Sequence, residues 1–295
     1  MKQYRSKKAG KEIIRTYNEL LTQWGVEYEE KMINTRYGQT HVTVWGKVDG
    51  APLVLFHGVG DDTALMWVYN AKALGERLRL YAIDTIGGPG KSVMGEAYNK
   101  EFDDVLWIDD ILDGLKLRKT SVAGVSHGGY LVQLYTVRRP ERVDKPIILA
   151  SSVAARKDGK KSNPLKAMMK IFLPEALFPT TNNIKKLLTK LSGDNPQAFT
   201  ENALLLEHFT WLLKGFNNMA MGYHKLETLT VDEVDIIRNR AHFLVGLEDP
   251  FEKLGGEAAL RDMKMNAKFY KGVGHGINHE IPEEVNKEII SIMCS

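Results

Sequence analysis

The chain has 295 residues, the size of one large α/β domain or two ordinary ones, and enough to bury a substantial core. Its 40 basic and 37 acidic residues leave a net charge of +3, too balanced to indicate nucleic acid or an anionic membrane as partner. The single cysteine, Cys294, excludes a disulfide framework within the chain and fits a reducing compartment. With neither an apolar leader nor a membrane-length apolar run in the sequence, we expect a cytoplasmic protein.

Apolar periodicity predicts an amphipathic helix over 11–24, followed by strands over 29–34 and 40–46 around a turn at Tyr37-Gly38. The predicted elements then alternate: strands over 52–56, 80–83, 121–125 and 146–150, and helices over 63–74, 102–115 and 128–138. Because these strands are short and almost continuously apolar, they fit a parallel sheet covered on both faces.

The alternation stops at Ser152. Three apolar stripes with helical spacing follow, over 165–172, 184–191 and 205–216. Strands over 241–245 and 267–270 and a helix over 282–293 then resume the pattern. The sequence therefore predicts one α/β domain over 1–295, with a helical cap over 153–235 inserted above the strand ends.

The segment Gly124-Val125-Ser126-His127-Gly128-Gly129 stands between a predicted strand and a predicted helix. Strand, G-x-S-x-G and helix form the context of a nucleophile elbow, a tight turn that exposes a serine hydroxyl above the sheet. The motif alone could also be a glycine-rich loop with an incidental serine. The rest of the chain has to supply the partners of this serine.

Two later loops supply these partners. Gly246-Leu247-Glu248-Asp249 follows one predicted strand, and Gly272-Val273-Gly274-His275 follows the next. The chain order Ser126, Asp249, His275 is the order expected of α/β-hydrolases. Each residue follows the carboxyl end of a strand, and in an open parallel sheet these ends share the edge where active sites form.

The expected roles follow from the chemistry of a weak nucleophile. Ser126 attacks, His275 takes its proton, and Asp249 orients the imidazole and stabilises its charged form. In such folds the oxyanion is bound by backbone N–H groups after the nucleophile and in the loop after the third strand, here those of His127 and Val59. His57 is expected to support that loop rather than to act as the base.

The chain resembles the α/β-hydrolase fold family, in particular its capped, carboxylesterase-like serine esterases. The resemblance is carried by the oxyanion loop, a D-x-x-G-x-G-x-S-like loop, the elbow, the G-x-x-D acid loop and the histidine turn with the start of the last helix: His57-Gly58, Asp84 to Ser92, Gly124 to Gly129, Gly246 to Asp249, and Gly274-His275 with Glu280, Pro282 and Glu283. One residue is added within the Asp84–Ser92 loop, and a helix precedes the first strand. These two departures affect the pocket rim and possible partners.

The resemblance implies a hydrolase that cleaves a small or medium apolar carboxylic ester through an acyl-enzyme. A pocket wall is expected from the insertion, with Trp211, Met219, Met221 and Phe178 as candidates. No metal or organic cofactor is expected; His275 and His279 are four residues apart, but Gly276 between them argues against a metal-binding helix. The expected partner is a small-molecule substrate, and the oligomeric state is left open.

Two alternatives stay open. The same triad could act on another bond, as a C–C bond hydrolase, a thioesterase or an aminopeptidase. The fold could also serve as a ligand-binding or signalling module.

Overall fold

The computed structural model describes residues 2–155, 171, 179–251 and 256–295. The described strands form one sheet in the order β1-β2-β4-β3-β6-β7-β8-β9, with β5 paired to β2. They are β1 (Tyr28–Thr35), β2 (Gly38–Gly46), β3 (Ala51–Phe56), β4 (Leu78–Ile83), β5 (Val93–Met94), β6 (Thr120–Val125), β7 (Val143–Leu149), β8 (His242–Gly246) and β9 (Ala267–Tyr270).

The sheet is mostly parallel, as predicted. Strands β4, β3, β6, β7, β8 and β9 pair in parallel, whereas β2 pairs antiparallel with β1, β4 and β5. The carboxyl ends of β3, β4, β6, β8 and β9 therefore meet at one edge. The loops that begin at His57, Asp84, Ser126, Leu247 and Lys271 all leave from that edge.

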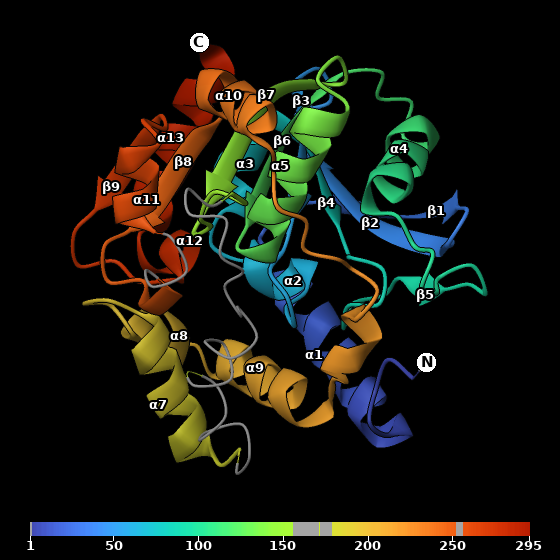
Figure 1. The fold of residues 1–295 in the computed structure, drawn as a ribbon. Helices are drawn as coiled ribbons and strands as arrows, with labels where there is room; N and C mark the ends of the chain where they lie inside the picture. Colours follow the sequence, from blue (N-terminus) through green and yellow to red (C-terminus); the bar gives the residue numbers. More distant parts are fainter. Residues whose placement is uncertain (1, 156–170, 172–178, 252–255) are drawn as a thin grey trace.

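Helices cover both faces of the sheet (Figure 1). The described helices are α1 (Lys7–Gln23), α2 (Thr63–Met66), α3 (Ala71–Gly75), α4 (Asp104–Gly114), α5 (His127–Arg138), α7 (Thr181–Leu191), α8 (Gln197–Thr200), α9 (Ala203–Gly215), the 3₁₀ helix η1 (Asn218–Met221), α10 (Val231–Arg240), α11 (Glu257–Asp262), α12 (Ile277–Glu280) and α13 (Pro282–Cys294). One apolar core joins α4, α5 and α10 to the sheet, and a second joins α1, α3 and α13 to it.

Helix α1 is the amphipathic helix that the sequence predicts. It begins after Ser6, whose side chain accepts a hydrogen bond from the Ala9 N–H at 3.1 Å. The side chains of Ile13, Tyr17, Leu20 and Leu21 on its apolar face are buried. The helix packs against α9, as Figure 1 shows, so part of its stripe covers the helical segment rather than the sheet.

The single helix predicted over 63–74 is wrong. Two short helices, α2 and α3, take its place, and the backbone leaves the helical conformation at Trp67. The reason is that the run 64–68 is buried on every side, so that no one-sided stripe holds it to a continuous helix. The stripe predicted over 165–172 lies, apart from Ile171, outside the described residues. The short elements β5, α10, α11 and α12 were not predicted.

The helices predicted over 184–191 and 205–216 correspond to α7 and α9. Helices α7, α8 and α9 lie together beyond the carboxyl edge of the sheet, and α9 lies beside α1 (Figure 1). Helix α10, at the end of the predicted cap, packs against α5. The described ranges contain no helix that is both long and apolar enough to cross a membrane.

Candidate active site

Ser126 lies in a strained turn between β6 and α5. Its φ of 56° falls in the left-handed region that a residue with a side chain rarely adopts. A Cβ on Gly124 would lie 2.2 Å from the Gly128 carbonyl oxygen, and a Cβ on Gly128 would lie 2.4 Å from that of Phe56. Only glycines therefore allow the turn to pack this tightly, and they leave the serine as its one side chain at the apex.

His275 and Asp249 are paired. The Nδ1 atom of His275 lies 2.7 Å from Oδ2 of Asp249, and the other oxygen of Asp249 accepts a hydrogen bond from the Phe251 N–H at 2.8 Å. Burial lowers the pKa of His275, but the charge and hydrogen bond of Asp249, and then the charges of Asp61 and Glu280, outweigh it, so the pKa lies above the usual 6.5. The Nε2 atom stays available for proton transfer.

The Ser126 hydroxyl makes no hydrogen bond to any residue that the structure describes. In unliganded enzymes such hydrogen bonds are often long and tighten only with substrate. The structure thus brings Ser126, Asp249 and His275 to the same sheet edge, with the acid–base contact formed.

Two backbone amides in this region are unused. Neither Val59 nor His127 has a hydrogen-bond acceptor for its N–H among the described residues. The His127 amide is at the N-terminus of α5, where unpaired N–H groups favour negative charge. Both amides are therefore available to bind an oxyanion.

His57 supports this loop, in agreement with its predicted role. Its Nδ1 atom lies 2.7 Å from the Gly58 carbonyl oxygen, and its Nε2 atom accepts a hydrogen bond from the Thr85 N–H at 2.9 Å. Burial lowers its pKa, so the ring is neutral and both of its nitrogens are occupied. It is not placed to act as a base.

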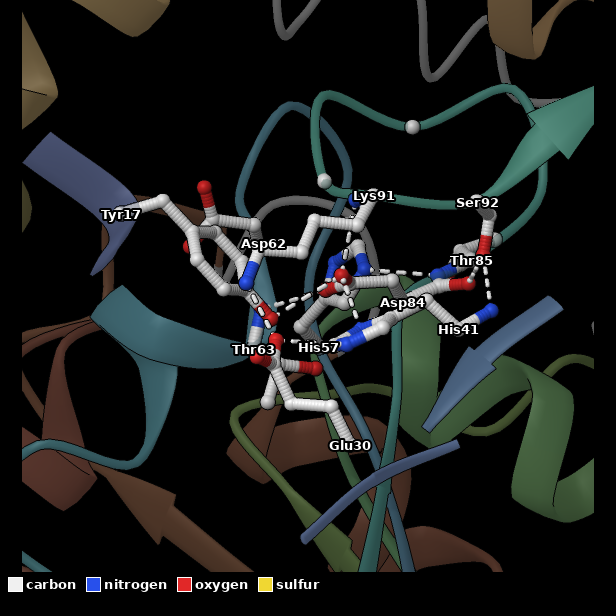
Figure 2. A network of polar contacts seen from close by, with 12 residues as sticks. Tyr17, Glu30, His41, His57, Asp62, Thr63, Asp84, Thr85, Lys91 and Ser92 are labelled. Carbon is white, nitrogen blue, oxygen red and sulfur yellow. Dashed lines mark hydrogen bonds and ion pairs between the residues drawn. The ribbon is translucent and has the colours of Figure 1, made fainter. Parts of the chain in front are cut away.

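Below the loop lies a buried polar network centred on Asp84, at the end of β4 (Figure 2). One oxygen of Asp84 accepts a hydrogen bond from the Thr63 N–H at 3.1 Å. The other is bound by the Tyr17 hydroxyl at 3.0 Å, by His41 Nδ1 at 2.9 Å and by the Lys91 N–H at 2.9 Å. The network ties α1, β2 and the 84–92 loop to the start of α2, directly after the oxyanion loop.

The N-terminal residues fasten the 84–92 loop from outside. The Gln3 side chain donates to the carbonyl oxygens of Gly88 and Gly90 at 2.6 and 3.0 Å, and the Tyr4 hydroxyl donates to that of Pro89 at 2.9 Å. These contacts use the loop with the added residue, and they were not foreseen because nothing in the sequence pairs residue 3 with residue 88.

A second set of contacts joins the helical segment to the site. His208 in α9 binds Asp62 at 2.8 Å through Nε2 and Thr16 at 2.7 Å through Nδ1, and all three side chains are buried. The Leu191 carbonyl oxygen accepts from the His275 N–H at 2.7 Å. The segment 191–221 therefore contacts both the oxyanion loop and the histidine loop.

Glu280 also joins the helical segment to the loop that contains His275. Its carboxylate accepts hydrogen bonds from the Gly193 N–H at 2.7 Å and from the Gly274 N–H at 3.1 Å. It holds the backbone next to His275 and is not the partner of that histidine, which pairs with Asp249.

The residues predicted to line the pocket differ in how deeply they are buried. Met221 is buried in the core, Trp211 is partly buried against it, and Met219 is 69% exposed. Phe178 lies outside the described residues. Which of these side chains line an acyl pocket stays a prediction.

Comparisons with known proteins agree with this architecture. The family model described as "alpha/beta hydrolase fold" matches residues 51–180. The structure of naproxen esterase (carboxylesterase NP) from Bacillus subtilis superposes with a TM-score of 0.80 at 25% identity, over 97% of this chain and 99% of that one.

Two curated relatives are also similar, both from Bacillus subtilis (strain 168). Carboxylesterase YbfK is 32% identical over 152 residues, which are 52% of this chain and 51% of the relative. The uncharacterized carboxylesterase nap is 38% identical over 135 residues, 46% of this chain and 45% of the relative. The chain thus aligns with about half the length of each of these curated relatives. The chain therefore has the α/β-hydrolase fold and is similar to carboxylesterases.

Proposed function

We propose that this protein is a serine hydrolase that cleaves carboxylic esters through an acyl-enzyme. The observation that carries the proposal is the 2.7 Å contact between His275 and Asp249, made in loops at the same sheet edge as the strained Ser126. The similarity to carboxylesterases supports an ester as the substrate. A cytoplasmic location stays part of the proposal.

The proposed reaction uses each group once in each half. The Ser126 hydroxyl oxygen adds to the ester carbonyl and gives its proton to Nε2 of His275, while Asp249 stabilises the imidazolium. The N–H groups of Val59 and His127 bind the oxyanion, and each such donor is worth about 3 kcal/mol. The tetrahedral adduct expels the alcohol, which takes the proton from His275. Water then repeats the sequence on the acyl-enzyme and releases the acid.

We further infer that the segment 153–235 acts as a cap and contributes to the choice of substrate. Its described part contacts the oxyanion loop through His208 and Asp62, and a Cβ on Gly60 would lie 3.3 Å from the side-chain oxygen of Asn218. Exchange of this segment with that of a relative is expected to change the order of preferred esters. An unchanged preference would count against a role in selectivity.

The first experiment is intact-mass spectrometry after treatment with a fluorophosphonate. We expect one adduct on the native protein, none on Ser126→Ala, and an undiminished adduct on Ser151→Ala, a matched serine just past the end of the neighbouring strand β7. Ester hydrolysis by Ser126→Ala is expected to fall by about 10⁶-fold in kcat. Native labelling that persists in Ser126→Ala would overturn the assignment of the nucleophile.

A substrate panel separates the alternatives. It includes 4-nitrophenyl esters of increasing chain length and naproxen methyl ester, because one similar structure is named as a naproxen esterase. Activity on a thioester, an amide or a diketone with none on esters would replace ester cleavage by another reaction of the same triad. A single slow turnover coupled to partner binding would indicate a ligand-binding module.

A further inference from the structure

Asp61 lies in the oxyanion loop on the side of the nucleophile. Its Oδ2 atom is 3.0 Å from the point that a Cβ on Gly58 would occupy, and this same point is 3.6 Å from the Cβ of Ser126. The carboxyl group and the nucleophile therefore flank one glycine. Asp61 is half-buried.

The carboxyl group of Asp61 has no hydrogen-bond donor or cation within hydrogen-bond distance among the described residues. The carboxyl group of the next residue, Asp62, does have hydrogen-bond partners. Asp62 is fully buried, accepts a hydrogen bond from the Leu65 N–H at 3.1 Å and pairs with His208. The described contacts thus explain Asp62 structurally but not Asp61, whose side chain caps no helix and closes no turn among the described residues.

Neighbouring groups of both charge signs affect the pKa of Asp61. Burial first, and then the charge of Asp62, raise its pKa from 3.8 to about 7, while His275 and His208 act in the opposite direction. In return, the negative charge of Asp61 contributes to raising the pKa of His275. A partly desolvated carboxyl group without a partner is costly, and groups of this kind concentrate at functional sites.

We propose that Asp61 is a specificity-determining residue whose carboxylate favours esters with a cationic group near the scissile bond and disfavours esters with a second negative charge. The inference rests on the proposed ester hydrolysis. A substrate carbonyl bound by Ser126 and the Val59 N–H lies beside this loop, so a charge on either side of the ester approaches Asp61. Because no cation of the described residues pairs with this carboxylate, the carboxylate attracts a cation on the substrate.

Two esters of matched shape test this. Butyrylcholine carries a quaternary ammonium, and 3,3-dimethylbutyl butyrate has a neutral carbon in the same place. The ratio of their kcat/KM values cancels the ionisation of His275, because both substrates need the same triad. We expect this ratio to be about tenfold higher at pH 8.5, where Asp61 is ionised, than at pH 5.5, where it is protonated.

The variant Asp61→Asn is expected to hold the ratio at the low value at both pH values. The control Asp49→Asn removes an exposed carboxylate in the turn before β3, at the opposite end of that strand, and should match the native protein. Because the pH dependence of the native protein is itself a measurement, the test does not depend on the folding of a variant.

The outcomes separate the two proposals. A native ratio that does not change with pH, or an Asp61→Asn ratio equal to the native one, would overturn the role of Asp61 while ester hydrolysis stands. Absence of hydrolysis of both esters, together with absence of fluorophosphonate labelling, would instead overturn the proposed function and with it this inference.

Discussion

At the turn that contains Ser126, some positions have no room for a Cβ atom and therefore require glycine. Gly128 is the sharpest case, because a Cβ there would meet the Phe56 carbonyl oxygen at 2.4 Å, a backbone atom that cannot rotate away. We expect Gly128→Ala to lower the free energy of unfolding by about 1–3 kcal/mol and to abolish fluorophosphonate labelling.

Gly25→Ala is the matched control for this prediction. Gly25 has φ of 63° but nothing within 4 Å of its Cβ position, so only backbone strain of about 1–2 kcal/mol is expected, with labelling retained. Chemical denaturation and intact-mass spectrometry measure both effects. Full labelling of Gly128→Ala would contradict the tight-turn argument.

The pairing of His275 with Asp249 predicts a pH dependence. The base must be neutral, so kcat/KM falls as the pH falls through the pKa of His275, which lies above 6.5. Asp249→Asn removes the negative charge that raises this pKa. We expect the acidic limb to move to lower pH and kcat to fall by about 10⁴-fold, as for the aspartate of a serine protease.

A pH profile of 4-nitrophenyl butyrate hydrolysis measures this prediction. Glu248→Gln, an exposed carboxylate in the same loop, is the control and should leave the profile unchanged. An acidic limb that stays in place in Asp249→Asn would show that another group sets the protonation of the base.

At the scale of elements, α1 and α9 hold the oxyanion loop through one buried histidine. His208 joins Asp62 at the start of α2 to Thr16 of α1. His208→Leu would leave the Asp62 carboxylate buried without its partner, and we expect a loss of about 3–5 kcal/mol in the free energy of unfolding.

The double variant His208→Leu with Asp62→Asn tests the cause of this loss. It removes the unpaired charge together with the histidine, so it should be destabilised less than the sum of the two single variants. Urea denaturation of the four proteins completes the cycle. Strict additivity would mean that the contact contributes nothing of its own.

At the scale of the whole molecule, the sequence predicted the elements that have a periodic pattern or a motif within one short segment. Period-two and buried strands, the helix before β1, and the strand–elbow–helix unit at Ser126 each have a pattern within one short segment. The loop positions of Asp249 and His275 also followed from the chain, because the carboxyl ends of parallel strands share an edge.

What the sequence could not supply is long-range pairing. Contacts such as Gln3 with Gly88, or His208 with Thr16 and Asp62, join segments that no periodicity relates. The helix predicted over 63–74 failed because burial on every side removed the stripe that would define one helix. Asp61 was overlooked because its importance lies in having no partner, which only the three-dimensional surroundings reveal.

The network around Asp84 gives a prediction for the stability of the whole fold. His41 lies between the carboxylates of Asp84 and Glu30, 2.9 and 2.8 Å away, and its side chain is 3% exposed (Figure 2). Burial lowers the pKa of His41, but the hydrogen bonds and charges of the two carboxylates raise it to about 9. The folded state thus binds the proton more tightly than the unfolded chain, whose histidine titrates near 6.5.

This stabilisation is therefore complete below about pH 6.5 and is lost as the pH rises through 9. We expect titration of His41 to cost the native protein up to about 3 kcal/mol of unfolding free energy between pH 6 and pH 9.5. Because the glutamine of His41→Gln cannot titrate, the loss in this variant should be smaller than the native loss by the same amount. Urea denaturation at both pH values measures the difference, and titrations of Asp61 and His275 cancel because both proteins contain them. Equal losses in the two proteins would mean that His41 carries no extra proton, and that Asp84 is stabilised by Tyr17 and the backbone amides alone.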